Sequence, residues 1–257
     1  MKLCESVNPV EAYEGRGIYV MPRILSDGRV PMTASQLMNY RISQSQSFPA
    51  WKDNWFFVSD LVAYSREDDG KAKFVLTVDK NGKVTDNGRT VLGMISPRER
   101  LSSGAVELGD RYDSLNGVEV AISNLGKTNN YMTRDEILGN KVWKILARHP
   151  DEVPAEFAED PALLGEYISW VESQTGNKNN MAVYVDSLGK SPKLRAWYVS
   201  RLDGRSDANG RGYLVNDLGR FVGIAPEAPN ARVLRPTLEQ SLSIVNQNLE
   251  GLELSIK

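Results

Sequence analysis

Hydrophobic positions recur along this chain with helical spacing in some segments and with strand spacing in others. A capping box at Thr33–Gln36 begins a helix of about three turns, because apolar residues follow it at helical intervals. A second box at Thr133–Glu136 precedes an apolar face that continues to Leu146. A third helix is expected from Pro161, a favourable first helical residue, to Gly176.

The stretch from Asn54 to Met94 has the character of β-structure. Phe56–Leu61, Phe74–Val78 and Thr90–Ile95 are rich in β-branched and aromatic residues. Turn residues at Asp79–Gly82 and Asp86–Gly88 lie between the predicted strands, and Asn-Gly pairs favour tight hairpins. The pattern predicts a small antiparallel meander.

Further strands are expected on either side of this region. Ile18–Val20 is a short strand candidate, and Met181–Val185 and Arg195–Ser200 return to strand character later in the chain. Tyr213–Val215 and Phe221–Ile224 are expected to form a hairpin. Hairpins mixed with separated helices indicate an α+β fold, with antiparallel β-hairpins and a few short helices.

The chain of 257 residues is long enough for one large domain. Residues 1–50 are interpreted as an N-terminal arm with a short helix, and residues 51–257 as a single mixed α+β domain. The weak periodicity before the first capped helix suggests that the arm anchors the domain to a larger assembly.

Charge and cysteine content exclude several classes of protein. The chain has 31 basic and 33 acidic residues, which argues against a dedicated nucleic-acid binder. Cys4 is the single cysteine and His149 the single histidine, so neither a disulfide within the chain nor a common zinc site can form. No apolar run approaches a membrane span, and the first residues lack a secretory signal. Synthesis in the cytoplasm is expected.

Motifs for catalysis or nucleotide binding are incomplete. Gly126–Thr128 resembles the end of a phosphate-binding loop, but Ala121 stands where that loop needs glycine. His149 could act as a general base with Asp151 or Glu152, although a cation at a helix end has a simpler electrostatic explanation. We therefore predict a protein without catalytic, cofactor-binding or metal-binding residues and without a cofactor.

The polar loop expected at Asp203–Gly212 carries oxygen ligands of the kind that calcium prefers. It does not fit an EF-hand, because Arg205 and Asn216 fall at the first and last ligand positions. A looser calcium site at Asp203, Asp207 and Asn209 stays open as an alternative, against a solvated loop.

The densest aromatic cluster is Trp51, Trp55, Phe56 and Phe57. Core packing is the simpler explanation, since aromatic side chains dominate core burial. The alternative is a carbohydrate-binding module in which Trp51 or Trp197 forms a stacking platform next to the calcium loop.

Five segments together resemble a domain-of-unknown-function family that is common in phages and gut bacteria. The segments are Leu92–Pro97, Gly109–Val118, Trp197–Arg201, Gly212–Gly219 and Ala231–Pro236. They are similar, in this order, to the family's stretch L-I-S-P followed by L-x-G-x-x-G-Y-N-N-G-V, and to its ending W-L-(A/R)-S-R, then G-(L/Y)-x-V-x-x-x-G, then (G/A)-V-R-P. The resemblance covers roughly residues 54–250.

The resemblance implies a C-type-lectin-like fold or one like that of formylglycine-generating enzymes. It also implies a non-catalytic virion structural protein of a phage or virus, as capsid decoration, head fibre or tail-associated module. Such a protein is made in the host cytoplasm, forms a homo-oligomer and contacts other virion proteins, and has no nucleic-acid or membrane partner. A calcium- or carbohydrate-binding surface module is the alternative function.

Overall fold

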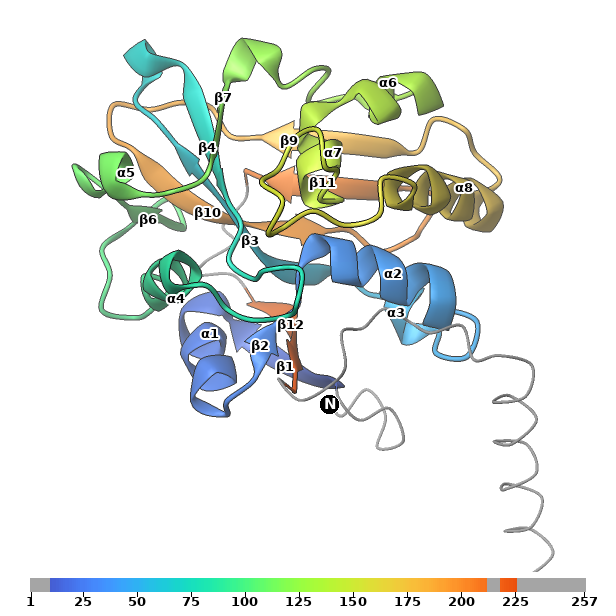
Figure 1. Ribbon diagram of the computed structural model, residues 1–257, viewed down its shortest axis with the longest axis horizontal. Helices are drawn as coiled ribbons and strands as arrows, with labels where there is room; N and C mark the ends of the chain where they lie inside the picture. Colours follow the sequence, from blue (N-terminus) through green and yellow to red (C-terminus); the bar gives the residue numbers. More distant parts are fainter. Residues whose placement is uncertain (1–9, 212–217, 226–257) are drawn as a thin grey trace, which may run out of the picture.

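A computed structural model describes residues 10–211 and 218–225, and these form an α+β fold around a large twisted sheet (Figure 1). The strands are β1 (Val10–Arg16), β2 (Val30–Pro31), β3 (Phe56–Tyr64), β4 (Lys71–Val75), β5 (Leu101–Ser102), β6 (Ala105–Glu107), β7 (Val118–Ala121), β8 (Tyr131–Met132), β9 (Met181–Val185), β10 (Lys193–Val199), β11 (Ser206–Gly210) and β12 (Leu218–Ile224). The α-helices are α1 (Gly17–Ser26), α2 (Ala34–Gln44), α3 (Ala50–Asp53), α4 (Asp86–Gly93), α5 (Arg111–Ser114), α6 (Arg134–Gly139), α7 (Lys141–Leu146) and α8 (Leu163–Thr175), with two 3₁₀ turns at Glu67–Asp69 and Ile122–Asn124.

The large sheet has the strand order β7-β4-β3-β10-β11-β9-β8, and β6 pairs with both β10 and β5. Its pairs are antiparallel except for β9 and β11, which run in parallel. A smaller antiparallel sheet of order β1-β12-β2 lies beside it. The expected mixture of hairpins and short helices is confirmed.

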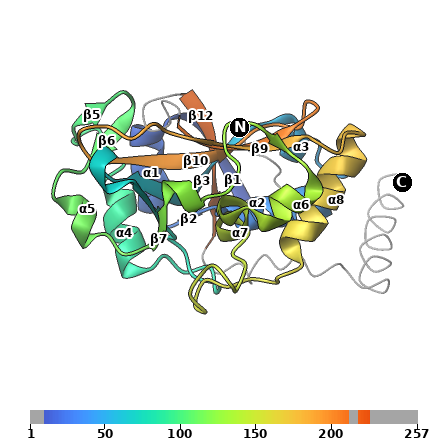
Figure 2. The same cartoon turned by 90° about the horizontal axis from the view of Figure 1, so that it is seen from above.

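Four helices cover one face of the large sheet. Buried residues of α2, α6, α7 and α8 form one hydrophobic cluster with alternate residues of β3, β4, β9, β10 and β11. In Figure 2, α6, α7 and α8 all lie on the same side of these strands. Because side chains alternate across a strand, this cluster uses every second residue of the sheet.

The opposite face of the sheet is covered over part of its width. Helices α1 and α4 and residues from the small sheet form a second cluster with β3, β4, β6 and β10. No residue of β9 or β11 belongs to this second cluster. Within residues 10–211 and 218–225, the second face of these two strands therefore has no hydrophobic cluster packed on it.

The N-terminal segment, interpreted as an arm with a short helix, contributes to the same two cores. Strand β1 pairs with β12 from Val10↔Ile224 to Arg16↔Leu218. Helix α1 contributes to the second cluster and α2 to the first.

Two expected strands are helices. Ile18–Val20 lies in α1, where Ile18, Met21 and Ile24 are buried at helical spacing although Pro22 is inside the helix. Thr90–Ile95 lies mostly in α4, because the hydroxyl of Thr85 accepts a hydrogen bond from the backbone N–H of Gly88 and caps a helix there.

Asp86–Gly88 is accordingly the first turn of α4 and not a hairpin turn. A Cβ at Gly88 would lie 2.0 Å from the backbone oxygen of Thr77. The glycine is required by close backbone packing, whereas Gly82, with φ of +77°, serves the predicted turn after Asp79.

The capping boxes at Thr33 and Thr133 are both present, and helix α8 ends at Gly176 with φ of +67°. The helix expected after Thr133 is divided in two, because Asn140 ends α6 and its side chain caps α7 through Trp143. Sequence-based expectations at Cys4, Tyr213–Val215 and beyond Ala225 lie outside the described residues.

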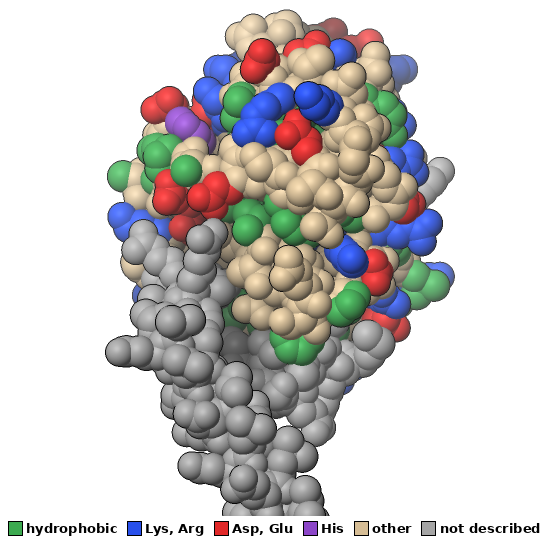
Figure 3. Space-filling model, turned by 90° about the vertical axis from the view of Figure 1, so that its right-hand side faces the viewer, with side chains coloured by type: hydrophobic (Ala, Val, Ile, Leu, Met, Phe, Trp, Pro, Cys, Tyr) green, Lys and Arg blue, Asp and Glu red, His purple; other side chains and the backbone are tan. Residues whose placement is uncertain are grey.

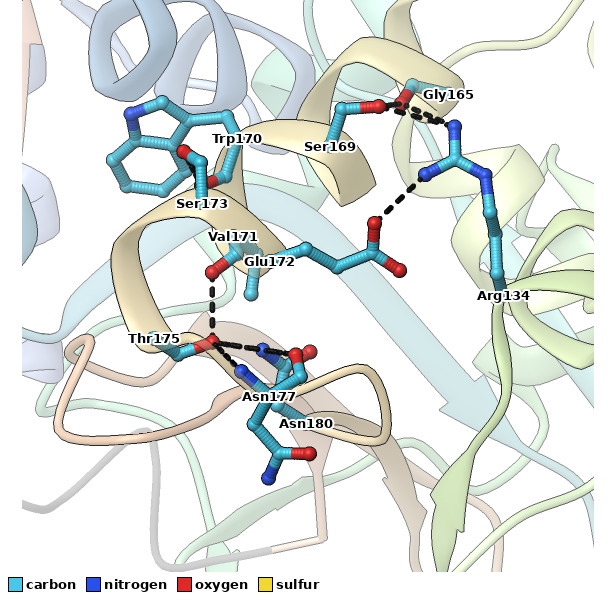
Figure 4. Close-up of polar contacts among 10 residues, drawn as sticks. All are labelled: Arg134, Gly165, Ser169, Trp170, Val171, Glu172, Ser173, Thr175, Asn177 and Asn180. Atoms are coloured by element: carbon cyan, nitrogen blue, oxygen red, sulfur yellow. Dashed lines mark hydrogen bonds and ion pairs between the residues drawn. The ribbon is translucent and has the colours of Figure 1, made fainter.

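Helix α8 is attached to its surroundings by polar contacts (Figure 4). Arg134 pairs with Glu172 at 3.1 Å and donates to the hydroxyl of Ser169 at 3.0 Å. After the helix, the Asn180 amide donates to Thr175, and the Asn180 carbonyl accepts the backbone N–H of Ser206 at 2.7 Å. The end of α8 is thereby linked to the start of β11. On the face that carries α6 and α8, acidic and basic side chains are interspersed (Figure 3).

A buried ion pair joins the first core to β3. Arg148 Nη2 lies 3.0 Å from Asp60 Oδ1, and both side chains are almost fully buried. The other Asp60 oxygen accepts the backbone N–H of Ala34 at 2.7 Å. Among the described helices, none is long and apolar enough to cross a membrane.

Arg41 of α2 is the other fully buried arginine, and it donates to groups on four segments. Its Nε reaches the carbonyl of Trp51 at 3.0 Å, and Nη2 reaches those of Ser200 at 2.7 Å and Asn54 at 3.1 Å. Its Nη1 donates to the Tyr167 hydroxyl at 2.7 Å. No carboxylate pairs with it among the described residues.

We expect Arg41→Lys to lower the free energy of unfolding by about 2–4 kcal/mol, because one ammonium cannot serve carbonyls on several sides and buried acceptors would lose their donors. The melting temperature should fall by roughly 5–15 °C in a scan of the full chain. Arg134→Lys is the matched control: its exposed ion pair should contribute about 1 kcal/mol or less. Equal, small shifts for both variants would contradict the structural role of Arg41.

Candidate functional site

The uncovered face of β9 and β11 carries polar and aromatic side chains. In β11, Ala208 belongs to the helix-covered core and Ser206 bonds to Tyr167 of α8 at 2.8 Å. Asp207 and Asn209 therefore project from the opposite face. The segment expected to be a loop is thus in part a central strand, flanked by β9 and β10.

Half-buried aromatic residues of the neighbouring strands share this face. Tyr184 of β9 is in register with Asn209, and Tyr198 of β10 pairs with Asn209 from the other side. Tyr131 of β8 lies one strand further out. We call the following group the open face: Trp55, Tyr131, Tyr184, Tyr198, Arg201, Asp203, Arg205, Asp207, Asn209 and Arg211.

A pocket of about 270 Å³ lies at one end of the open face. It is lined by Trp55, Phe57, Tyr198, Ser200, Arg201, Asp203 and Arg205. The ring centroids of Trp55 and Tyr198 are 5.9 Å apart and meet edge to face. Phe57 contacts both rings at 5.4 and 6.0 Å, so the aromatic wall is fixed by mutual packing.

The floor under this wall depends on β12. A Cβ at Gly219 would lie 1.9 Å from the Phe57 ring and 3.0 Å from that of Trp55. Phe221 of the same strand stacks on Phe57 at 4.6 Å. A strand distant in sequence therefore sets the position of the pocket aromatics.

Charged groups of both signs form the other wall. Arg201 Nε donates to Asp203 Oδ2 at 2.8 Å, and Arg205 Nε lies 3.6 Å from Asp203 Oδ1. Arg205 Nη1 donates to the Tyr131 hydroxyl at 3.2 Å. The hydrogen bond from Arg201 holds the pKa of Asp203 below its ordinary value.

Asp207 lies behind Arg205, with its Oδ2 3.7 Å from Arg205 Nε. The Asp207 side chain is 8% exposed, and its Oδ1 has no hydrogen-bond partner among the described residues. Burial raises the pKa of Asp207 to about 6, and the Arg205 guanidinium offsets only part of this rise.

The three oxygen-bearing residues of the calcium alternative have partners within the protein. Asp203 is engaged by arginine, and Asn209 donates to the Tyr198 hydroxyl at 3.0 Å while accepting from the backbone of Arg211. The described residues contain no group of three or more acidic, histidine or cysteine side chains that could hold a metal ion.

The aromatic platform was assigned by sequence to the wrong residues. Trp51 and Trp197 are buried in the first core, at 3% and 0% exposure. Core packing is therefore confirmed for Trp51, Phe56 and Phe57, and Trp55 packs against the second core from a half-buried position in which it also lines the pocket. No local sequence signal distinguishes Trp55 from its buried neighbours.

The remaining sequence candidates lie elsewhere. His149 shares a turn with Asp151, whose backbone N–H donates to its Nδ1 at 3.3 Å, at the end of α7. Lys127 pairs with Glu136 at 3.0 Å in the loop before α6. Neither residue lines the pocket at the open face.

A larger hollow of about 370 Å³ lies between β4, β7 and the segment 154–157. Its walls include Phe74, Leu76, Val118 and Phe157, and Glu156 is the charged residue among those that line it. We take the pocket at the open face as the candidate site because it combines aromatic surface with cationic and anionic groups.

Comparisons with known proteins show the fold. No family model matches the chain, and no curated protein matches it. One solved structure, described as the accommodation of massive sequence variation in Nanoarchaeota by the C-type lectin fold, matches with a TM-score of 0.57 and 16% identity. The match covers 85% of this chain and 99% of that chain. The chain has a C-type-lectin-like fold.

We expect Asp207→Asn to raise the melting temperature at pH 7.5 and to leave it almost unchanged at pH 4. Because the folded-state pKa is raised from 3.8 to about 6, the native state favours the protonated acid. That contribution is fully present below pH 3.8 and is lost as the pH rises through about 6. Thermal scans of both proteins at the two pH values measure the difference.

Asp203→Asn is the control with the opposite sign. Its pKa is lowered, so its stabilising contribution is present at neutral pH and is lost on acidification. The substitution should lower stability slightly at pH 7.5, since the ion pair is exposed. A destabilised Asp207→Asn at pH 7.5 would show that its carboxylate is a favourable buried charge.

Proposed function

We propose that this protein is a non-catalytic recognition protein that binds carbohydrate at the open face. The observation that carries the proposal is the aromatic wall of Trp55 and Tyr198, half-buried at the edge of the second cluster and facing the charged side chains of the pocket. Solvent-accessible aromatic side chains next to fixed polar groups are characteristic of binding sites.

The chemistry of the pocket suits a sugar ring. One face of a pyranose presents C–H groups, and these carry partial positive charge that complements the negative face of an indole or phenol ring. Its hydroxyl groups both donate and accept hydrogen bonds, and the pocket offers carboxylate acceptors at Asp203 and guanidinium donors at Arg201 and Arg205. The small volume suits a single sugar residue at the end of a chain.

A binding role is favoured over catalysis by where the one histidine lies. His149 is at the end of α7, on the helix-covered side of the sheet, and its nearest acidic partner is the exposed Asp151 at 3.6 Å. The pocket itself contains ion-paired carboxylate and guanidinium groups and no histidine.

The fold supports the same view by analogy. The solved neighbour is described as accommodating massive sequence variation within the C-type lectin fold. In this chain, Arg201, Asp203 and Arg205 of the open face lie outside both hydrophobic clusters, whereas Trp55 and Tyr198 pack on the edge of the second one.

Oligosaccharide binding tests the proposal. On a glycan array probed in the presence of EDTA, the full chain should bind at least one saccharide, and Trp55→Leu should weaken that binding by about 10-fold or more. Leucine keeps an apolar cover on Phe57 but removes the stacking surface. Tyr19→Ala, at an exposed position on α1, should bind as the wild type does. No saccharide binding by the folded wild type would reject the proposal.

We propose further that the protein belongs to a virion, where such a module would be displayed as capsid decoration, head fibre or tail-associated domain. The support is the order of sequence segments that resembles the phage-associated family, together with the lectin-like fold. The proposal includes self-assembly and contacts with other virion proteins.

Mass spectrometry of purified particles checks this placement. The protein should co-purify with particles through a density gradient at a fixed stoichiometry to the major capsid protein. Recovery in the lysate alone, with none in the particle fraction, would contradict it.

A further inference from the structure

Arg201 and Arg205, the two arginines of the pocket, have N–H donors that are not used in contacts among the described residues. A guanidinium presents five N–H donors. Among the described residues, Arg201 makes its contacts through Nε, and Arg205 makes its contacts through Nε and Nη1. The remaining terminal N–H groups have no partner among the described residues, and both side chains are more than half exposed. They are available to a ligand in the pocket that they line.

Asp203 holds both arginines in position but contacts only the Nε group of each. It accepts from Arg201 through Oδ2 and faces Arg205 through Oδ1, so one carboxylate lies between two guanidinium groups. Tyr131 fixes Arg205 from the other side at 3.2 Å. The donors are thus positioned before a ligand arrives, which reduces the entropy lost on binding.

The balance of charge favours a singly charged anion. The charged residues that line the pocket are Arg201, Arg205 and Asp203, two cations and one anion. A singly charged anion balances the excess positive charge, whereas a dianionic phosphate exceeds it and would lie close to the Asp203 carboxylate. A carboxylate fits the planar guanidinium donors with half that charge.

The aromatic wall indicates that the ligand has further groups besides a negative charge. The aromatic surface of Trp55 and Tyr198 calls for an apolar face, and the acceptors of Asp203 call for hydroxyl donors. A carboxylated sugar combines all three features in one ring: a C–H face, hydroxyl donors and a single negative charge.

We infer that the ligand of this pocket is a carboxylated sugar, a uronic or sialic acid residue of a larger saccharide, whose carboxylate is held by Arg201 and Arg205 without a metal ion. The inference rests on the proposed carbohydrate-binding function and specifies its ligand class. In the described structure the cationic role that calcium could play belongs to two side chains of the protein itself.

A paired array tests the inference. Oligosaccharides that contain uronic or sialic acids are printed beside their carboxyl-reduced forms and are probed with the full chain in EDTA. Wild-type protein should bind at least one carboxylated member 10-fold or more tightly than its reduced form. The preference should weaken as sodium chloride is raised, because exposed charges are screened.

Substitutions then assign the preference to the arginines. Arg201→Gln with Arg205→Gln should lower the ratio of the affinities for the carboxylated and reduced forms to about one. Because glutamine keeps N–H donors, binding to the reduced form should weaken but stay measurable. Arg89→Gln on α4 should bind as wild type. The uronic and sialic acid members separate the two sources of carboxylate.

The possible results distinguish failure of the proposed function from failure of the ligand inference. If no saccharide binds, the proposed carbohydrate-binding function is rejected, and the inference about its ligand is rejected as well. If reduced and carboxylated forms bind equally, or if the double variant keeps the preference, the inference alone is overturned. A glutamate-rich peptide and a phosphorylated sugar are included on the same array, and tighter binding of either than of any carboxylated saccharide also overturns it.

Discussion

A single buried guanidinium holds the segments from which the candidate site is built. Arg41 donates to the carbonyl of Ser200, directly after β10, and to the carbonyl of Asn54, directly after α3. It also donates to the hydroxyls of Tyr167 in α8 and Ser206 at the start of β11. Because these acceptors are backbone or hydroxyl groups, the charge is stabilised by dipoles alone. The loop from Arg201 to Arg205 is therefore flanked by two residues, Ser200 and Ser206, that both bond to Arg41.

The position of the site follows from an asymmetry in the large sheet. Buried residues of four helices pack on one face, whereas on the second face the hydrophobic cluster of the described residues extends only as far as β10. Strands β9 and β11 are consequently hydrophobic on one side and polar or aromatic on the other. An uncovered sheet face that carries Tyr184 and Asn209 is stable in water, where an apolar one would not be.

Local signals predicted the elements whose geometry is determined locally. The capping boxes at Thr33 and Thr133 and the glycine after α8 act within one helical turn, and they are present as expected. Strand β11 could not be predicted in this way, since Ser-Asp-Ala-Asn-Gly has turn-like composition and becomes a strand because β9 and β10 pair with it on both sides.

The candidate site was predictable only in part for the same reason. Asp203, Asp207 and Asn209 attracted attention as oxygen ligands, but their arginine and tyrosine partners come from segments that only the fold brings together. Trp55 was hidden within a run of aromatic residues, three of which are buried. Arg41 looked like an ordinary helical cation, because no local pattern distinguishes a buried arginine from an exposed one.

Alternate residues of β11 are subject to different structural constraints. Ser206, Ala208 and Gly210 are constrained by Tyr167, the first core and the Trp197 ring, so change at these positions would disturb folding. Asp207 and Asn209 lie between them on the opposite face, where their partners are the polar groups of Arg205, Tyr198 and Arg211 and not the first core. Under the proposed binding role, substitutions at every second codon of this short segment would change the polar surface next to the pocket, while the residues that pack against the first core stay the same.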